Sequence, residues 1–321
     1  MNPDVGAIER SLSGRTPRYG ALARVKNECD VIEAFVRHHA ALLDGLVVVD
    51  NASGDGTREI LDLLVCEGLP LVVVDDATLE FRQAEIMSYL ARATFATFGF
   101  DRLFLLDADE FVFAADRAEI DRALAPFRDD ESVRIPWATY VPSGEDEPGV
   151  SPLARIVDRR GTERVPEYKI VLPSSFASRV GATIAQGNHS ITDGGTTVRT
   201  PVADLRLAHL PVRSPAQLLT KSLLAWTSYV AMGYDGEYGA QWKTLAATDG
   251  PTIASTIREI AFGYPGDPSE FEEDVLVREP VPNAAPLRYA HLAKPDPMQT
   301  VARFAEQIAR RYASMRKVRG G

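Results

Sequence analysis

Short, wholly aliphatic runs that alternate with helical stretches constrain the fold of this chain more than any other feature. They lie at residues 46–49, 71–74 and 103–106, and residues 22–25 begin a similar run. Continuous apolar runs of this length are typical of strands buried on both faces of a parallel sheet. The alternation therefore predicts an α/β fold with a mostly parallel sheet flanked by helices.

Apolar residues at helical spacing predict the connecting helices and a change of character near residue 212. Helices are expected over residues 28–43, 57–67 and 80–98, and, after residue 213, over 214–232, 251–262 and 297–318. Further short strands are expected at residues 133–141, 170–172, 182–184 and 205–208. We therefore expect an N-terminal tail (1–18), an α/β domain (19–212) and a helical C-terminal appendage (213–321).

Composition excludes several classes of function. The chain has 321 residues and a formal net charge of −10, which argues against binding nucleic acid because that needs a basic surface. Cys29 and Cys66 form no CxxC pair, so zinc-cluster and thioredoxin-like sites are excluded. Two buried free thiols in a reducing cytoplasm are expected, and one disulfide between them is the alternative. Residues 1–18 are polar, and no apolar run approaches the ~20 residues that span a bilayer, so we expect a cytoplasmic protein.

Two carboxylates follow the run at 103–106. Asp107 and Asp109 are two positions apart, so on an extended segment they point to the same side. Ligands of open parallel sheets bind at the carboxyl ends of strands, and two carboxylates there suit a hard divalent cation that also takes diphosphate oxygens. A solvated acidic turn after a strand would have the same sequence.

A second polar turn follows the run at 46–49. Asp50 stands at the strand end, where a carboxylate accepts hydrogen bonds from a base or a ribose. Ser53, Asp55 and Thr57 are common turn and helix N-cap residues, so local structure alone accounts for those three.

These motifs, taken in order, resemble family 2 glycosyltransferases. The motifs are Val25-Lys26-Asn27-Glu28, then Val49-Asp50-Asn51-Ala52-Ser53-Gly54-Asp55-Gly56-Thr57, then Leu106-Asp107-Ala108-Asp109-Glu110-Phe111. The later block at 205–214 with Lys221, and Lys169 followed by the turn at 187–189, look like the bacterial type 4 branch of that family. The resemblance covers about residues 20–222 and implies a Rossmann-like GT-A fold that binds a nucleotide-sugar.

The resemblance also implies roles for individual residues. Contacts to the nucleotide are implied for Lys26, Asn27, Glu28, Asp50, Arg82 and Asp107. Ligation of Mn²⁺ or Mg²⁺ is implied for Asp107 and Asp109, with a histidine from far downstream. His209 is the first candidate for that histidine and His189 the second, while Lys169, Arg213 and Lys221 are candidates to bind phosphate or acceptor.

An inverting transfer needs a carboxylate base that takes the proton of the acceptor hydroxyl. The family usually places it in an acidic pair between the DxD motif and the downstream histidine, and this chain has no clear pair there. Glu167 and Asp193 are the substitutes, with Asp146 behind them.

The function expected from the sequence is thus a metal-dependent, hexosyltransferase-like glycosyltransferase (EC 2.4). It would move a sugar from a UDP-, GDP- or dTDP-sugar to a saccharide, lipid-linked or small-molecule acceptor. A non-catalytic nucleotide-sugar-binding protein and a sugar nucleotidyltransferase remain alternatives, although the segment at 25–28 lacks the glycines of a nucleotidyltransferase phosphate loop. Basic residues at 310–319 on an amphipathic helix predict peripheral contact with the inner face of the membrane, or a docked helix with a solvated face.

Overall fold

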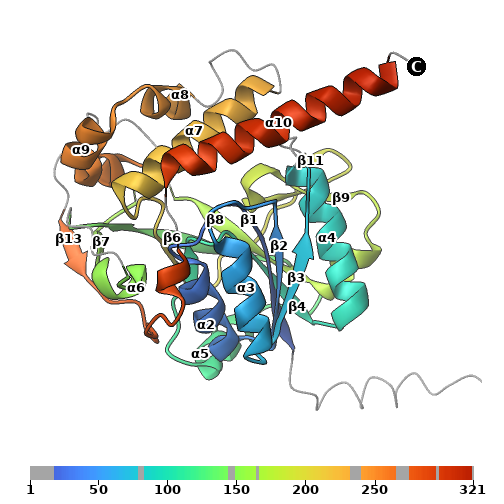
Figure 1. Ribbon diagram of the computed structural model, residues 1–321. Coiled ribbons are helices and arrows are strands. Elements are labelled where there is room, and N and C mark those ends of the chain that lie inside the picture. The colour runs from blue at the N-terminus through green and yellow to red at the C-terminus, as the bar shows by residue number, and fades with distance from the viewer. Residues whose placement is uncertain are drawn as a thin grey trace, which may run out of the picture.

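The computed structural model describes residues 18–78, 83–143, 149–163, 166–231, 240–264, 275–293 and 296–319. Within these ranges a ten-stranded mixed sheet forms the centre of the molecule, and helices cover both of its faces (Figure 1). The predicted α/β fold is therefore confirmed. It has the mixed, mostly parallel sheet flanked by helices that the GT-A resemblance implies.

The first four strands lie side by side and parallel, as the aliphatic runs predict. Their order in the sheet is β3 (Leu71–Asp75), β2 (Gly45–Asp50), β1 (Tyr19–Val25) and β4 (Arg102–Leu106). Beyond β4, antiparallel pairs add β8 (Tyr168–Pro173), β6 (Val133–Val141), β7 (Asp158–Arg160) and β13 (Leu276–Arg278). β12 (Leu207–His209) joins β6 to β5 (Glu110–Val112).

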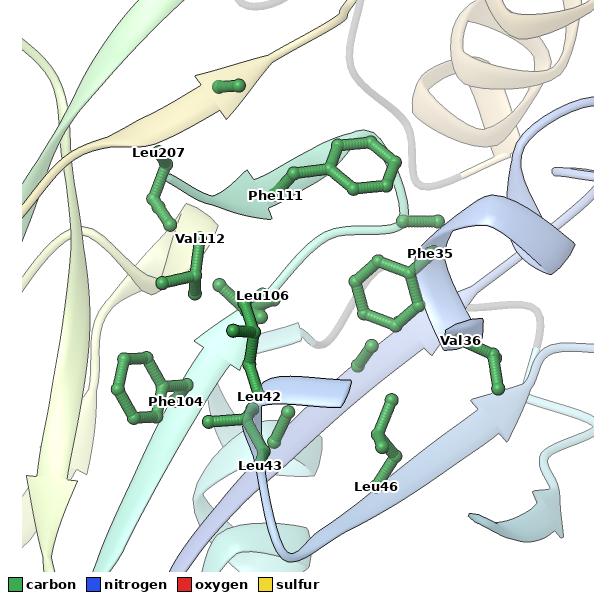
Figure 2. Close-up of a cluster of buried hydrophobic side chains, with 14 of the residues drawn as sticks. Phe35, Val36, Leu42, Leu43, Leu46, Phe104, Leu106, Phe111, Val112 and Leu207 are labelled. Atoms are coloured by element: carbon green, nitrogen blue, oxygen red, sulfur yellow. The ribbon is translucent and has the colours of Figure 1, made fainter. Parts of the chain in front are cut away.

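Alternate residues of the parallel strands enter different cores. Ala21, Ala23 and Val48 face a core formed with α2 (Ile32–Leu42), α3 (Thr57–Cys66) and α5 (Arg117–Leu124). Figure 2 shows the part of this core where Phe35 of α2 faces Phe111 of β5. On the opposite face, Leu22 and Val47 pack against α4 (Gln83–Phe98) and a three-stranded sheet of β9 (Ala182–Ile184), β10 (Ile191–Asp193) and β11 (Thr196–Thr197).

β3 differs from the expectation of a strand buried on both faces. Val72 is 40% exposed, because β3 forms the edge of the sheet and has β2 as its sheet neighbour. The uniform apolar run marks a strand of a parallel sheet but does not distinguish its edge from its centre.

The C-terminal helices lie across the edge of the sheet at which β1 to β4 end. They are α7 (Pro215–Ala231), α8 (Ala240–Ala246), α9 (Gly250–Gly263) and α10 (Pro297–Arg319), and α7 and α10 pack side by side (Figure 1). This region is not only helical, since β13 pairs antiparallel with β7 and extends the main sheet. Short helices complete the described chain: α6 (Pro152–Arg155), η1 (Ser174–Ser178), η2 (Gln186–Asn188) and η4 (Ala290–Leu292).

Two further expectations concern the cysteines and membrane-spanning helices. Cys29 is buried as expected, whereas Cys66 is exposed at the end of α3, and no disulfide joins them. Among the helices in the described ranges, none combines the length and apolarity needed to cross a bilayer.

Candidate functional site

A cavity of about 450 Å³ lies where β1 and β4 end, between the sheet and the C-terminal helices. Residues of three predicted motifs line it: 26–28 after β1, 107–109 after β4, and His209 at the end of β12. Lys169, His189 and Lys221 also line its wall. The fold thus brings together most of the side chains that the sequence singled out, from segments far apart in the chain.

Asp107 is held by a buried lysine. Lys169 Nζ donates to Asp107 Oδ2 at 2.5 Å and to the carbonyl oxygen of Gly187 at 2.8 Å, and it lies 3.3 Å from Glu110 Oε1. Burial alone would lower the pKa of Lys169, but the charges of Asp107 and Glu110 hold it above its usual value. Lys169 is therefore a permanent cation in the floor of the cavity.

Asp109 is surrounded by positive charge. Lys221 Nζ of α7 donates to its Oδ2 at 2.8 Å, and Arg213 Nη1 lies 3.6 Å from the same oxygen. Burial alone would raise the pKa of this carboxyl, but the charge of Lys221 and that of Arg213 hold it well below its usual range. Asp109 is therefore ionised at neutral pH.

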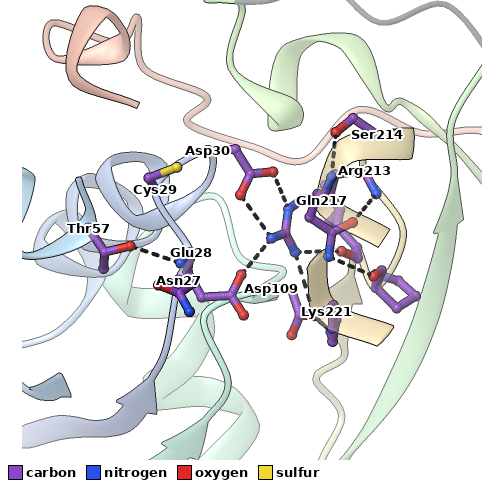
Figure 3. A network of polar contacts seen from close by, with 12 residues as sticks. Asn27, Glu28, Cys29, Asp30, Thr57, Asp109, Arg213, Ser214, Gln217 and Lys221 are labelled. Atoms are coloured by element: carbon purple, nitrogen blue, oxygen red, sulfur yellow. Dashed lines mark hydrogen bonds and ion pairs between the residues drawn. The ribbon is translucent and has the colours of Figure 1, made fainter. Parts of the chain in front are cut away.

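Arg213 ties the segment after β1 to the start of α7. Its buried guanidinium donates to Glu28 Oε2 at 2.5 Å and to the two carboxylate oxygens of Asp30 at 2.7 and 2.9 Å (Figure 3). Burial raises the pKa of Glu28 to about 7, against the opposing charges of Arg213 and Lys221. Glu28 lines the cavity, but its carboxylate is already bound to an arginine.

The segment after β1 and the turn after β2 are joined by hydrogen bonds. Asn27, with a left-handed φ of 56°, donates from its backbone to Ser53 Oγ at 2.8 Å and accepts from the backbone of Gly54 at 2.7 Å. Lys26 Nζ donates to the carbonyl oxygen of Asn51 at 2.6 Å, and burial lowers the pKa of Lys26 to about 8. Lys26 is thus a half-buried cation that has no hydrogen bond to a carboxylate among the described residues.

Asp50, predicted to contact the nucleotide, is buried and does not itself line the cavity. It is 4% exposed, its Oδ2 accepts from the backbone of Ser53 at 3.2 Å, and its Oδ1 has no hydrogen-bond partner among the described residues. Its neighbour Asn51 lines the cavity. Asp55 accepts from the Thr57 hydroxyl at 2.6 Å, so these two turn residues have the structural role that local sequence explains.

The two predicted catalytic bases lie in different places. Glu167 Oε2 is 3.6 Å from Nδ1 of His189, which lines the cavity. Asp193 is exposed on β10 in the separate three-stranded sheet and does not line the cavity, because the chain leaves the main sheet before residue 182. Arg82 and Asp146 lie outside the described residues.

The carboxylates and histidines of the cavity supply few ligands for a divalent cation. The described residues hold no group of three or more His, Cys, Asp or Glu side chains that could bind a metal ion. Asp109 Oδ1 and His209 Nε2 nevertheless face each other at 4.0 Å, and burial lowers the pKa of His209 to about 3, so its imidazole is neutral. One carboxylate oxygen and one imidazole nitrogen fit a cation such as Mn²⁺ that takes its other ligands from a bound diphosphate.

Several aromatic side chains of the cavity were not predicted from the sequence. The Trp137 ring of β6 stacks on His209 with ring centroids 4.0 Å apart, and Tyr264 meets the same imidazole edge-on at 5.8 Å. Trp242 of α8 and Phe304 of α10 also line the cavity. The sequence carries no signal for them, because an aromatic residue in an amphipathic helix or strand is more often part of a core.

Comparison with known proteins gives matches among solved structures alone. No protein-family model and no curated protein matches the chain. Residues 1–349 of TarS from S. aureus share 13% identity, with 79% of this chain and 76% of that chain covered and a TM-score of 0.37. The mannosyltransferase PcManGT from Pyrobaculum calidifontis, solved with GDP-Man and Mn²⁺, shares 18%, with 77% and 72% covered and a TM-score of 0.39.

A third similar structure is glucosyl-3-phosphoglycerate synthase from Mycobacterium tuberculosis, solved with Mn²⁺, UDP and glucosyl-3-phosphoglycerate. It shares 17% identity, with 43% of this chain and 49% of that chain covered and a TM-score of 0.28. With TM-scores of 0.39 or less, these three similarities carry no argument for an activity.

Proposed function

We propose that this chain is a glycosyltransferase that takes a sugar from a nucleoside-diphosphate sugar and passes it to an acceptor hydroxyl. The observation that carries the proposal is the charge arrangement in the cavity. Three lysines, Lys26, Lys169 and Lys221, line it beside the carboxylates of Asp107 and Asp109. A diphosphate placed there meets fixed positive charge on several sides, which stabilises the negative charge that develops as the sugar leaves.

The donor is proposed to lie along the ends of β1 and β4. Asn27 and Asn51 flank the nucleoside end, Asp107 reaches the ribose, and Lys26 meets the diphosphate. Lys169 and Lys221 reach the diphosphate from β8 and α7. Asp50 supplies a buried carboxylate oxygen behind this wall, and that oxygen has no other partner among the described residues.

Asp109 and His209 are the proposed holders of a divalent cation, with Mn²⁺ favoured by the mixed oxygen and nitrogen ligands. When bound, the cation would neutralise and orient the departing diphosphate. Asp107 is the weaker metal candidate, because its Oδ2 is bonded to Lys169.

The proposed base is His189, with Glu167 as its positioning residue. Nδ1 of His189 lies 2.8 Å from the carbonyl oxygen of Tyr168, an acceptor only, so Nδ1 carries the proton and Nε2 carries the lone pair. Glu167 then stabilises the imidazolium that forms when His189 takes the proton of the acceptor hydroxyl. A base acting this way implies a single displacement with inversion at the anomeric carbon.

Two parts of the proposal do not follow from the residues of the cavity. The sugar transferred is proposed to be a hexose, and the acceptor is proposed to be a saccharide, a lipid-linked molecule or a small molecule. A peripheral membrane contact through the basic end of α10 stays a prediction, since the side chains from residue 314 onward lie outside those described.

Turnover of UDP-, GDP- and dTDP-sugars with and without Mn²⁺ tests the function. We expect one donor to be consumed by the parent protein and by Asp62→Asn, a change at an exposed carboxylate of α3, and not by Asp109→Asn. Binding of a donor without turnover under any condition would favour the non-catalytic alternative. Release of pyrophosphate from a nucleoside triphosphate and a sugar phosphate would favour the nucleotidyltransferase.

A further inference from the structure

Helix α10 is fastened to the turn that follows β2. The Arg303 guanidinium donates to the carbonyl oxygen of Gly54, and Gln307 Nε2 donates to that of Ala52 at 3.1 Å. The approach is close, since a Cβ added at Gly54 would lie 3.0 Å from Cδ of Arg303. A helix almost 250 residues downstream is therefore docked on the turn that carries Asp50.

One apolar side chain of this helix reaches the cavity. Phe304 is only 4% exposed, and it lines the cavity at the end where Lys26 and Asn51 also lie. Lys26 Nζ stands 5.1 Å from the centre of the Phe304 ring. An aromatic ring and the cation that lies over it are thus placed together on the wall of the cavity.

We propose that residues 297–307 of α10 complete the donor site, and that Phe304 is the surface on which the base of a nucleoside diphosphate stacks. The inference rests on the proposed function and adds a determinant from a region that the motifs do not cover. Every nucleobase has a flat π-face, so an aromatic wall binds it whatever its hydrogen-bonding edge. In the free protein Lys26 covers the Phe304 ring, so base stacking requires Lys26 to turn from the ring to the diphosphate that follows the nucleoside.

The hydrogen bonds from α10 to the turn after β2 hold the Phe304 ring in a fixed position. Arg303 and Gln307 precede and follow Phe304 by one and three positions, so the hydrogen bonds to the turn fix the rotation of the helix about its axis. The α10–α7 contact supports the helix from the other side. The ring is therefore held in place before the ligand arrives, which lowers the entropy cost of binding.

The test is a titration of UDP and GDP, in the presence of Mn²⁺, into the full-length parent, Phe304→Ala, Phe304→Leu and Met298→Ala. Met298, on the same helix, is 78% exposed and is the matched control. We expect Phe304→Ala to raise the dissociation constant of the preferred nucleoside diphosphate about 10-fold or more, Phe304→Leu to raise it less, and Met298→Ala to leave it unchanged. Binding of inorganic pyrophosphate should not change in any variant, because it has no base.

The inference would be overturned if Phe304→Ala and the parent bound the nucleoside diphosphate with equal affinity. It would also be overturned if Phe304→Ala bound more tightly than the parent, since α10 would then cover the site rather than complete it. The double variant Arg303→Ala/Gln307→Ala keeps the ring but releases the helix, and we expect it to weaken nucleotide binding as well. Unchanged binding by that variant would also count against the inference. If the parent binds neither UDP nor GDP, the proposed function fails; if the parent binds one and Phe304→Ala binds it equally, only this inference fails.

Discussion

Lys169 Nζ and Asp107 Oδ2 are 2.5 Å apart although 62 residues separate them in the chain. The antiparallel pairing of β8 with β4 brings them together, since Lys169 lies on β8 and Asp107 directly follows β4. Glu110, buried in the same place, is 3.3 Å from the lysine. The first aspartate of the DxD motif is thus part of a fixed ion cluster before any ligand binds.

Removing the cation of this cluster should destabilise the fold. In Lys169→Met, Asp107 and the buried Glu110 lose their positive partner, and we expect the free energy of unfolding in urea to fall by about 3 kcal/mol. Lys243→Met, at an exposed lysine of α8, is the control and should change stability little. A Lys169→Met protein as stable as the parent would show that the cluster has no structural role.

Donor affinity should depend on the charge of Lys26. Burial lowers the pKa of this lysine to about 8, so the free protein loses the charge as pH rises through that value. Affinity for a nucleoside diphosphate is therefore expected to be full below pH 7 and to fall as pH rises from 7 to 9. Lys26→Arg keeps its charge over this range and should show a flatter profile in calorimetric titrations. Parallel profiles for the two proteins would remove Lys26 from the diphosphate site.

Cation binding should require the nucleotide. Among the described residues Asp109 and His209 are the two proposed protein ligands, so Mn²⁺ alone is expected to bind weakly and to bind at least 10-fold more tightly when UDP or GDP supplies diphosphate oxygens. Mn²⁺ titrations followed by electron paramagnetic resonance measure this. Asp109→Asn and His209→Ala should each abolish the enhancement. An enhancement that survives in Asp109→Asn would place the cation elsewhere.

Steady-state kinetics distinguish a residue that acts as the base from one that binds the donor. We expect His189→Gln to lower kcat about 100-fold with the donor KM unchanged, because general-base catalysis contributes on that scale. Glu167→Gln should lower kcat less and shift the pH profile of kcat, since it acts through the imidazole. Asp193→Asn, at an exposed position outside the cavity, should be neutral. If Asp193→Asn lost most of its kcat while His189→Gln kept the kcat of the parent, Asp193 and not His189 would be the base.

Much of the fold could be predicted because hydrophobic pattern is local. The aliphatic runs gave β2, β3 and β4 within a residue or two, and the strand expected at 133–141 is β6. The helices expected at 57–67 and 251–262 appear as α3 and α9 with ends shifted by one residue. Short strands such as β5, β7 and β13 were missed, since three residues carry too little pattern and their partners are distant in the chain.

The site was predictable only where a strand end fixes a side chain. Asp107, Asp109 and Lys26 follow strands, so the parallel order alone predicts that they meet at one edge of the sheet. The pairing of Arg213 with Glu28 depends on how α7 docks, and the place of Phe304 on how α10 docks, and no local pattern encodes either. Asp193 was selected by residue type and position in the chain, without knowledge that β10 leaves the main sheet.

The central claim is that a nucleoside diphosphate binds in the cavity against Lys26, Lys169 and Lys221 with a cation at Asp109. Calorimetric titration of UDP, GDP and dTDP with Mn²⁺ into the parent and into Asp109→Asn tests it most directly. We predict micromolar binding of one nucleotide by the parent and loss of most of that affinity in the variant. No binding of any of the three by the folded parent, or equal binding by parent and variant, would contradict the account.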